Sequence, residues 1–169
     1  VNESLPDTIR LQAKANLTMS YRFSNSDTVK TLAEELIKEA SKIHYISVLR
    51  NAYNELFIHY YINGALEEAQ ATNFKLLEVL RAEYGEEHAD VASVYNYIGM
   101  VYRSQGDYSR ALSYHLKSTQ IAEKLLDNER KQSLLSTVYN NIGIIYNEQR
   151  EYKKGLEYYF KRLKVDELL

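Results

Sequence analysis

The sequence contains no cysteine and very few of the residues that interrupt helices. Its 169 residues include one proline, Pro6, and six glycines. The absence of cysteine excludes disulfides, thiol nucleophiles and thiolate metal sites, and it leaves the cellular compartment undetermined. Sandwiches and barrels need frequent glycine and proline between their strands. The scarcity of both residues therefore favours an all-α fold.

Long apolar runs and a large excess of charge of one sign are also absent. No segment reaches the roughly 18 apolar residues that a membrane-spanning helix needs, and no signal peptide is recognisable. The formal net charge is −2, and basic residues are spread along the chain. We therefore expect no nucleic-acid partner and no direct membrane contact by this segment.

The side chains that carry chemistry form no catalytic or metal-binding pattern. The four histidines, His44, His59, His88 and His115, never stand four residues apart, which is the spacing at which one helical face holds a metal ion. No glycine-rich phosphate loop is present. We predict a protein that is not an enzyme and binds no metal or cofactor, in which the histidines are structural and His88 belongs to a helix start.

The dominant feature of the chain is an internal repeat. YNYIGMVYRSQGDYSRAL begins at Tyr95 and YNNIGIIYNEQREYKKGL begins at Tyr139, with Tyr, Asn, Ile, Gly, Tyr, Gln, Tyr and Leu in the same order. From Gly99 to Gly143 the offset is 44 residues. A third copy, with Phe57 in the glycine slot, lies 42 residues before Gly99, and a fainter fourth copy precedes it.

Each copy contains two helices joined by a short polar turn, because apolar positions recur at helical spacing on either side of that turn. Four copies predict eight helices, at about 8–23, 27–42, 46–63, 66–84, 89–105, 108–126, 130–149 and 152–168. We assign a single domain to residues 1–169, with repeats at about 7–43, 46–84, 88–127 and 129–169. The start at Val1 and the stop within the helical segment KRLKVDELL suggest a fragment of a longer protein.

Glycine and tyrosine have specific places in the repeat. Gly99 and Gly143 fall in mid-helix, where glycine costs about 1 kcal/mol relative to alanine. We expect close helix approach there, with the following tyrosines, Tyr102 and Tyr146, buried over the gap. The 16 tyrosines are expected to pack between helices with their hydroxyls at the rim. An aromatic binding platform is the alternative.

This pattern resembles the tetratricopeptide repeat, whose signature has an aromatic residue, Leu-Gly, Tyr and then Ala in the second helix. The matching residues of one copy are Tyr95, Ile98, Gly99, Tyr102 and Ala111. The period of 42 to 44 residues and the phrase EEHADVA are similar to the long subtype of kinesin light chains and many bacterial regulators. Gly155 in the alanine slot and the missing terminal proline depart from the signature. The resemblance implies a right-handed α-solenoid of about four hairpins, whose first helices line a concave binding face.

The helical face opposite the Tyr-Ile-Gly-Tyr stripe supplies the candidate binding residues. One row is Asn54, Asn96 and Asn140, whose amides suit the backbone of a bound peptide. The apolar row beside it is Met19, Ile58, Met100 and Ile144. Other positions on this face are Asn51, Tyr61, Ser93, Arg103, Thr137 and Asn147, with Gln12, Ala15 and Arg22 in the first copy.

A structural role for these rows is equally consistent with the sequence. The asparagines can hydrogen-bond between neighbouring helices, and the apolar row can be covered by the next repeat. Some tetratricopeptide domains bind acidic chain ends through lysines. The corresponding positions here are Ala15, Asn54, Asn96 and Asn140, so that lysine clamp is not expected.

We therefore predict a non-catalytic module that binds a protein or peptide ligand in a concave groove. The opening residues are similar to repeats of Bacteroidetes sensor proteins, which implies the sensory or scaffolding region of a bacterial signalling protein, cytoplasmic or periplasmic, with a histidine kinase, cyclase or transcription-regulator output. One alternative is an oligomerisation spacer that forms a homodimer through its exposed end helix. Another is a peptide-sensing regulator resembling response-regulator phosphatases, although the sequence shows no amino-terminal bundle of their kind.

Overall fold

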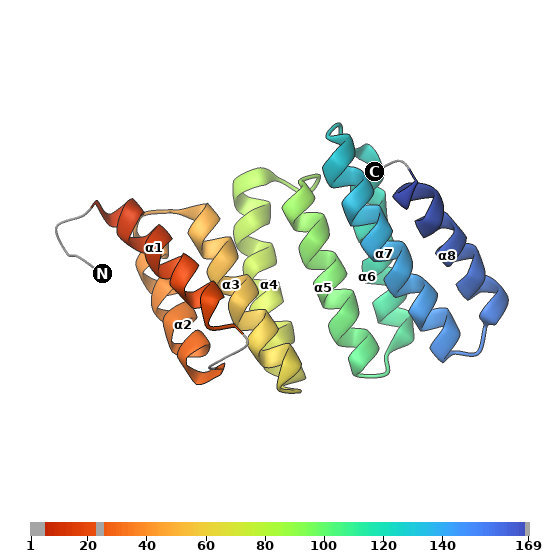
Figure 1. Cartoon of the computed structure of the whole chain (residues 1–169), viewed down its shortest axis with the longest axis horizontal. Helices are drawn as coiled ribbons and strands as arrows, with labels where there is room; N and C mark the ends of the chain where they lie inside the picture. The colour runs from red at the N-terminus through yellow and green to blue at the C-terminus, as the bar shows by residue number, and fades with distance from the viewer. Residues whose placement is uncertain (1–5, 23–25, 168–169) are drawn as a thin grey trace. The chain divides into compact units, whose positions relative to one another are not determined.

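The computed structural model describes residues 6–22 and 26–167, and these residues form eight α-helices and no strand (Figure 1). The helices are α1 (Asp7–Ser20), α2 (Ser26–Lys42), α3 (Ile46–Ile62), α4 (Leu66–Tyr84), α5 (Ala89–Ser104), α6 (Tyr108–Lys124), α7 (Asn128–Glu148) and α8 (Tyr152–Asp166). This confirms the predicted all-α fold. The helix ends predicted at residues 23 and 168 lie outside the described residues. The helix predicted to end at residue 126 ends at Lys124, because Leu125 has extended backbone with ψ of 138°.

The chain divides into two compact units, residues 1–76 and 77–169, and the division falls inside α4. In the first unit α1 packs against α2 and α3, and α2 packs against α3. In the second unit α5 and α6 form one hairpin and α7 and α8 form another, while α7 also contacts α5 and α6 (Figure 1). The assignment of all 169 residues to one domain stays a prediction.

Side-chain caps define where several helices of the second unit begin. Asp107 and Asp127 each accept a hydrogen bond from the backbone N–H three residues later, at 2.9 and 3.1 Å. His88 precedes α5, and its Nδ1 accepts from the Asp90 backbone N–H at 3.2 Å, which confirms its predicted place at a helix start. Each cap satisfies a donor that the first helical turn leaves unpaired, and such caps contribute about 1 kcal/mol.

Three of the turns inside hairpins place a residue in the left-handed region. Gly64 and Gly106 do so with φ of 72° and 78°, which glycine adopts without a Cβ penalty. In the turn between α7 and α8, Arg150 stands 44 residues after Gly106 and has φ of 62°. A non-glycine residue costs about 1 to 2 kcal/mol in this conformation. The α7–α8 turn is therefore more strained than its counterpart.

Gly99 and Gly143 lie where the two helices of a hairpin approach closely. A Cβ atom at Gly99 would lie 2.8 Å from the His115 ring of α6, and one at Gly143 would lie 2.6 Å from the Tyr159 ring of α8. Both distances are well below van der Waals contact, so glycine is the residue that fits. The close approach confirms the expectation from sequence. The ring over each glycine, however, belongs to the second helix and not to the following tyrosine.

The first unit reverses these sizes. Phe57 occupies the glycine slot, and Asn73 stands 42 residues before His115. Phe57 and Asn73 are both buried. Each hairpin therefore combines one large and one small residue at these two equivalent positions, which keeps the filled volume similar.

Tyr102 and Tyr146 stack on tyrosines of the second helix. The ring centroids of Tyr102 and Tyr114 are 5.4 Å apart, and those of Tyr146 and Tyr158 are 5.6 Å apart. The Arg110 guanidinium lies 4.5 Å from the Tyr102 ring centroid, a cation–π arrangement. Tyr102 is buried as predicted, whereas the prediction of burial is wrong for Tyr146, which is half-buried. Among the described helices α8 packs mainly on α7, so this hairpin has fewer neighbours to cover its rings.

His115 is the polar centre of the α5–α6 hairpin. Its side chain is fully buried, and neither ring nitrogen has a hydrogen-bond partner among the described residues. Burial, helped by the positive charge of Arg103, lowers the pKa of His115 from 6.5 to about 4. The ring is therefore neutral at pH 7 and acts as an aromatic core residue packed over Gly99.

Candidate functional site

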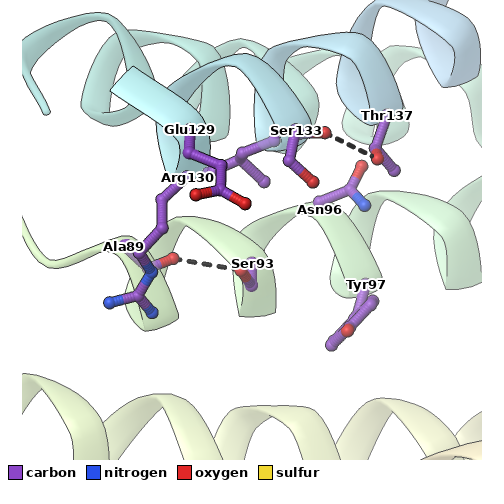
Figure 2. Close-up of a pocket in the computed structure, with 9 residues that line it drawn as sticks. Ala89, Ser93, Asn96, Tyr97, Glu129, Arg130, Ser133 and Thr137 are labelled. Carbon is purple, nitrogen blue, oxygen red and sulfur yellow. Dashed lines mark hydrogen bonds between the residues drawn. The ribbon is translucent and has the colours of Figure 1, made fainter. Parts of the chain in front are cut away.

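The first helices of the two hairpins in the second unit, α5 and α7, lie side by side and leave a groove between them (Figure 2). Its volume is about 370 Å³. The lining residues are Ala89, Ser93, Asn96 and Tyr97 on α5 and Glu129, Arg130, Ser133, Leu134 and Thr137 on α7. Within each helix these positions are mainly three or four residues apart, so each set occupies one helical face.

Two ion pairs join α5 to α7, one toward each end of the two helices. Asp90 pairs with Arg130 at 2.9 Å, and Arg103 pairs with Glu148 at 2.7 Å. Figure 2 shows Arg130 reaching from α7 toward the first turn of α5. Pairs exposed to solvent in this way contribute roughly 0 to 1 kcal/mol each. Their main effect is to hold the two helices in register on either side of the groove.

Asn96 provides the polar contact between these ion pairs. Its side chain is only 2% exposed, and its Oδ1 accepts a hydrogen bond from Asn141 Nδ2 at 2.9 Å. The bond spans α5 and α7 directly. Asn96 thus makes the inter-helix contact that the sequence allowed for, and it also lines the groove.

The other two predicted asparagines have different surroundings. Asn140 accepts a hydrogen bond from the Arg162 guanidinium of α8 at 3.0 Å, and its side chain is half-buried. In the first unit, Asn54 has a buried Oδ1 with no hydrogen-bond partner among the described residues. The three members of the asparagine row therefore meet three kinds of environment, and their joint role in binding stays a prediction.

Two hydroxyl groups in the groove donate to their own helices. Ser93 donates to the Ala89 carbonyl at 3.0 Å, and Thr137 donates to the Ser133 carbonyl at 2.9 Å (Figure 2). A hydroxyl that has spent its hydrogen still accepts through its oxygen lone pairs. Ser93 and Thr137 therefore present acceptors to the groove.

The remaining predicted site residues differ in exposure. Asn147 is exposed, whereas the half-buried ones are Ile58, Tyr61, Met100, Arg103 and Ile144. The Tyr61 ring packs on Phe57 with centroids 5.5 Å apart. None of these six residues lines the α5–α7 groove, so among the predicted lining positions the groove contains Ser93, Asn96 and Thr137.

Sequence reasoning missed the amino-terminal part of the groove. Arg130 and Ser133 stand seven and four residues before Thr137, which the sequence analysis had already placed on this face. Continuing the same helical row toward the start of α7 would have found both. The pairing of Asn96 with Asn141 in place of Asn140 carried no sequence signal, because it depends on how α7 is rotated against α5.

The described residues show no metal-binding cluster: within 6–22 and 26–167, no group of three His, Cys, Asp or Glu side chains is arranged to hold an ion. No helix in the described part of the chain is long and apolar enough to cross a membrane. The groove itself offers hydrogen-bond acceptors, amides and one ion pair, an inventory suited to recognition of polar groups.

Comparison with known proteins bears on the fold and the family. Residues 48–124 match the family model described as "Tetratricopeptide repeat". Among 56 matching solved chains is the crystal structure of BtubC (BKLC) from P. vanneervenii. It has a TM-score of 0.83 at 21% identity, and the match covers 99% of this chain and 67% of that one. This likeness shows the fold, an all-α solenoid of helical repeats. A search of curated proteins found no match.

Proposed function

Since this chain is a tetratricopeptide-repeat protein, with residues 48–124 matching the family, we propose that it is a non-catalytic module that binds a protein or peptide in the groove between α5 and α7. Repeats of this kind generally mediate protein–protein interaction through extended surfaces formed by stacked units. The proposal goes further by naming one groove and the chemistry of what it holds, an extended peptide segment recognised through its backbone.

The observation that carries the proposal is the arrangement of polar atoms along the groove. Ser93 and Thr137 offer oxygen acceptors because their hydrogens are bonded to their own helices. Asn96 offers amide hydrogens because its Oδ1 already accepts from Asn141. An extended peptide presents N–H and C=O groups in alternation, and acceptors beside a donor match that alternation.

The side chains that continue this face extend the proposed site. Met100 and Arg103 follow Asn96 on α5, and Asn140, Ile144 and Asn147 follow Thr137 on α7. We propose that the half-buried Met100 and Ile144 contact apolar side chains of the ligand. In the first unit the equivalent proposed residues are Asn54, Ile58 and Tyr61 of α3.

A groove-filling variant tests the proposal. Peptides that bind the purified chain would be selected from a random phage-displayed library, and their affinities measured by fluorescence anisotropy. Ser133→Trp should block the groove and weaken binding by about tenfold or more, as filling a recognition pocket does. Ser113→Trp is the matched control, since Ser113 is an exposed serine on α6 outside the groove. Equal binding by both variants would contradict the proposal.

We also propose the wider context suggested by the opening residues, the sensory or scaffolding region of a bacterial signalling protein. A module that recognises peptide backbone suits reception of a partner rather than chemistry on a substrate. The full coding sequence tests this directly. A histidine kinase, cyclase or DNA-binding output domain is expected, and a metabolic enzyme domain in its place would argue against the assignment.

A further inference from the structure

We propose that an exposed apolar face of α8 docks an acidic amphipathic helix of a separate partner protein. The α8 face consists of Tyr152, Leu156, Phe160 and Leu163, which recur every three or four residues and are all more than half exposed. A hollow of about 390 Å³ runs along it, lined by Leu156, Tyr159, Phe160, Arg162, Leu163 and Asp166. Exposed apolar surface of this extent on one helix marks an interaction site.

The preceding hairpin shows which kind of element covers such a face. The residues 44 positions earlier, on α6, are Tyr108, Leu112, Leu116 and Thr119, and α7 packs against α6. Thr119 is 8% exposed whereas Leu163 is 52% exposed, and Leu116 is 44% exposed against 61% for Phe160. A helix therefore covers the equivalent surface one repeat earlier, and a helix is the element that fits the α8 face.

The charges beside the α8 face indicate an acidic partner. Lys153 and Lys164 follow Tyr152 and Leu163 by one residue, which places them along one edge of the face. Both are exposed, and neither pairs with a carboxylate anywhere in the described chain. The neighbouring Lys154, by contrast, has its own partner in Glu151. Glutamates or aspartates on the docking helix would complete the two unpaired ammonium groups.

The same charges disfavour a second copy of this chain. Two α8 helices packed antiparallel would bring Lys153 of one copy near Lys164 of the other, and like charges facing each other oppose association. An anionic membrane is disfavoured by the carboxylates of Asp166 and Glu167 at the end of the face. The hollow between the apolar side chains also has the form that receives knobs from a packed helix.

The probe is the sequence of α7, the helix that covers α6. A peptide of residues 128–148 contains two acidic and two basic side chains, so its side-chain charge is zero. In the protein, Lys131 Nζ donates to the Glu123 carbonyl at the end of α6, at 2.7 Å, and the α8 equivalent of Glu123 is Glu167, close to Lys164. An acidic peptide carries Arg130→Glu and Lys131→Glu, and a basic peptide carries Glu129→Lys and Glu148→Lys.

Fluorescence anisotropy with the whole chain measures the order of affinity. We expect the acidic peptide to bind at least about tenfold more tightly than the basic one, with the unmodified peptide between them, and the difference to shrink as salt rises. Lys153→Glu together with Lys164→Glu should reverse the order. An order independent of charge, or no binding by any of the three peptides, overturns the proposal.

Two variants at equivalent positions locate the binding surface. Phe160→Asp should weaken acidic-peptide binding by about tenfold or more, whereas Leu116→Asp, on the equivalent exposed position of α6, should change it less than about twofold. Equal effects of both variants overturn the proposal. So does concentration-dependent dimerisation abolished by Phe160→Asp, which assigns the face to a second copy. Binding to phosphatidylcholine vesicles containing phosphatidylserine, abolished by the same change, overturns it in favour of a membrane.

Discussion

The α5–α6 and α7–α8 hairpins share a sequence pattern at an offset of 44 residues, yet they differ wherever a position depends on its neighbours. The glycine of the first hairpin lies under a fully buried histidine, and that of the second lies under the half-buried Tyr159. One hairpin turns through Gly106 and the other through Arg150. The first hairpin has a helix against each of its members, because α7 contacts both. The comparison teaches that the repeat specifies a backbone and that the neighbouring helix decides what each side chain contributes.

The largest difference is expected for the stacked tyrosines. Tyr102→Ala removes a buried ring and should cost about 3 to 5 kcal/mol, the range for deleting a large aromatic side chain. Tyr146→Ala removes a half-buried ring, so about half that loss is expected. Urea denaturation of both variants measures the two values. A loss below about 1 kcal/mol at both sites would show that the tyrosine stacks do not support the fold.

The two mid-helix glycines should respond differently to an added methyl group. Gly99→Ala drives a Cβ into the fully buried His115 ring, and overpacking of this kind costs about 1 to 3 kcal/mol. Gly143→Ala meets Tyr159, whose half-buried ring has room to swing outward. There the helix-propensity gain of about 1 kcal/mol should offset much of the strain. Equal destabilisation in thermal melts would mean that the two sites are equally rigid.

Asn96 and Asn140 occupy equivalent positions and test the asparagine row. Asn96→Ala leaves the Asn141 amide without its partner and should cost about 1 to 2 kcal/mol. Asn140→Ala breaks a bond to an exposed arginine and should cost less than about 0.5 kcal/mol. Thermal midpoints of these variants and of Asn54→Ala need no ligand. A large, uniform drop at all three would assign the whole row to structure, whereas no drop at Asn96 would assign it to binding.

His115 should make the first hairpin sensitive to mild acid. Its pKa in the folded chain is about 4, against 6.5 when unperturbed, so the unfolded chain binds more protons between these values. Stability is therefore full above pH 6.5 and is lost as the pH falls toward 4. Between pH 7.5 and 5.5 the loss should be about 1 kcal/mol. His115→Tyr, which copies the residue at position 159, should abolish this loss, and an unchanged pH slope in that variant would exclude His115 as its source.

The smallest expected effect is a gain of stability at the strained turn. Arg150→Gly places glycine at φ of 62°, as in the equivalent turn at Gly106. The relief of left-handed strain exceeds the added entropy of the unfolded chain, so a gain of about 0.5 to 1 kcal/mol is expected. Differential scanning calorimetry measures it, with Gln149→Gly as the control because Gln149 has a right-handed backbone. A loss at Arg150 would show that its side chain contributes more than its backbone costs.

Much of the fold was predictable from local pattern. The helices were placed to within a few residues because apolar spacing and polar turns are encoded over short stretches of chain. The close approach at Gly99 followed from the cost of a mid-helix glycine that nothing local repaid. The site was less predictable. Ser93, Asn96 and Thr137 were placed on the face that lines the groove, but Arg130 and Glu129 were missed because the helical row was not continued to the start of α7.

The sequence by itself determined the all-α class, the hairpin repeat and which face of each helix turns inward, since all three depend on periodicity within about twenty residues. The tertiary structure alone decided that Asn96 pairs with Asn141, that His115 and not Tyr102 covers Gly99, and that Tyr146 stays half-buried. Each of these outcomes depends on the rotation and approach of a helix about 20 to 45 residues away, and side-chain packing at that separation leaves no local trace in the sequence.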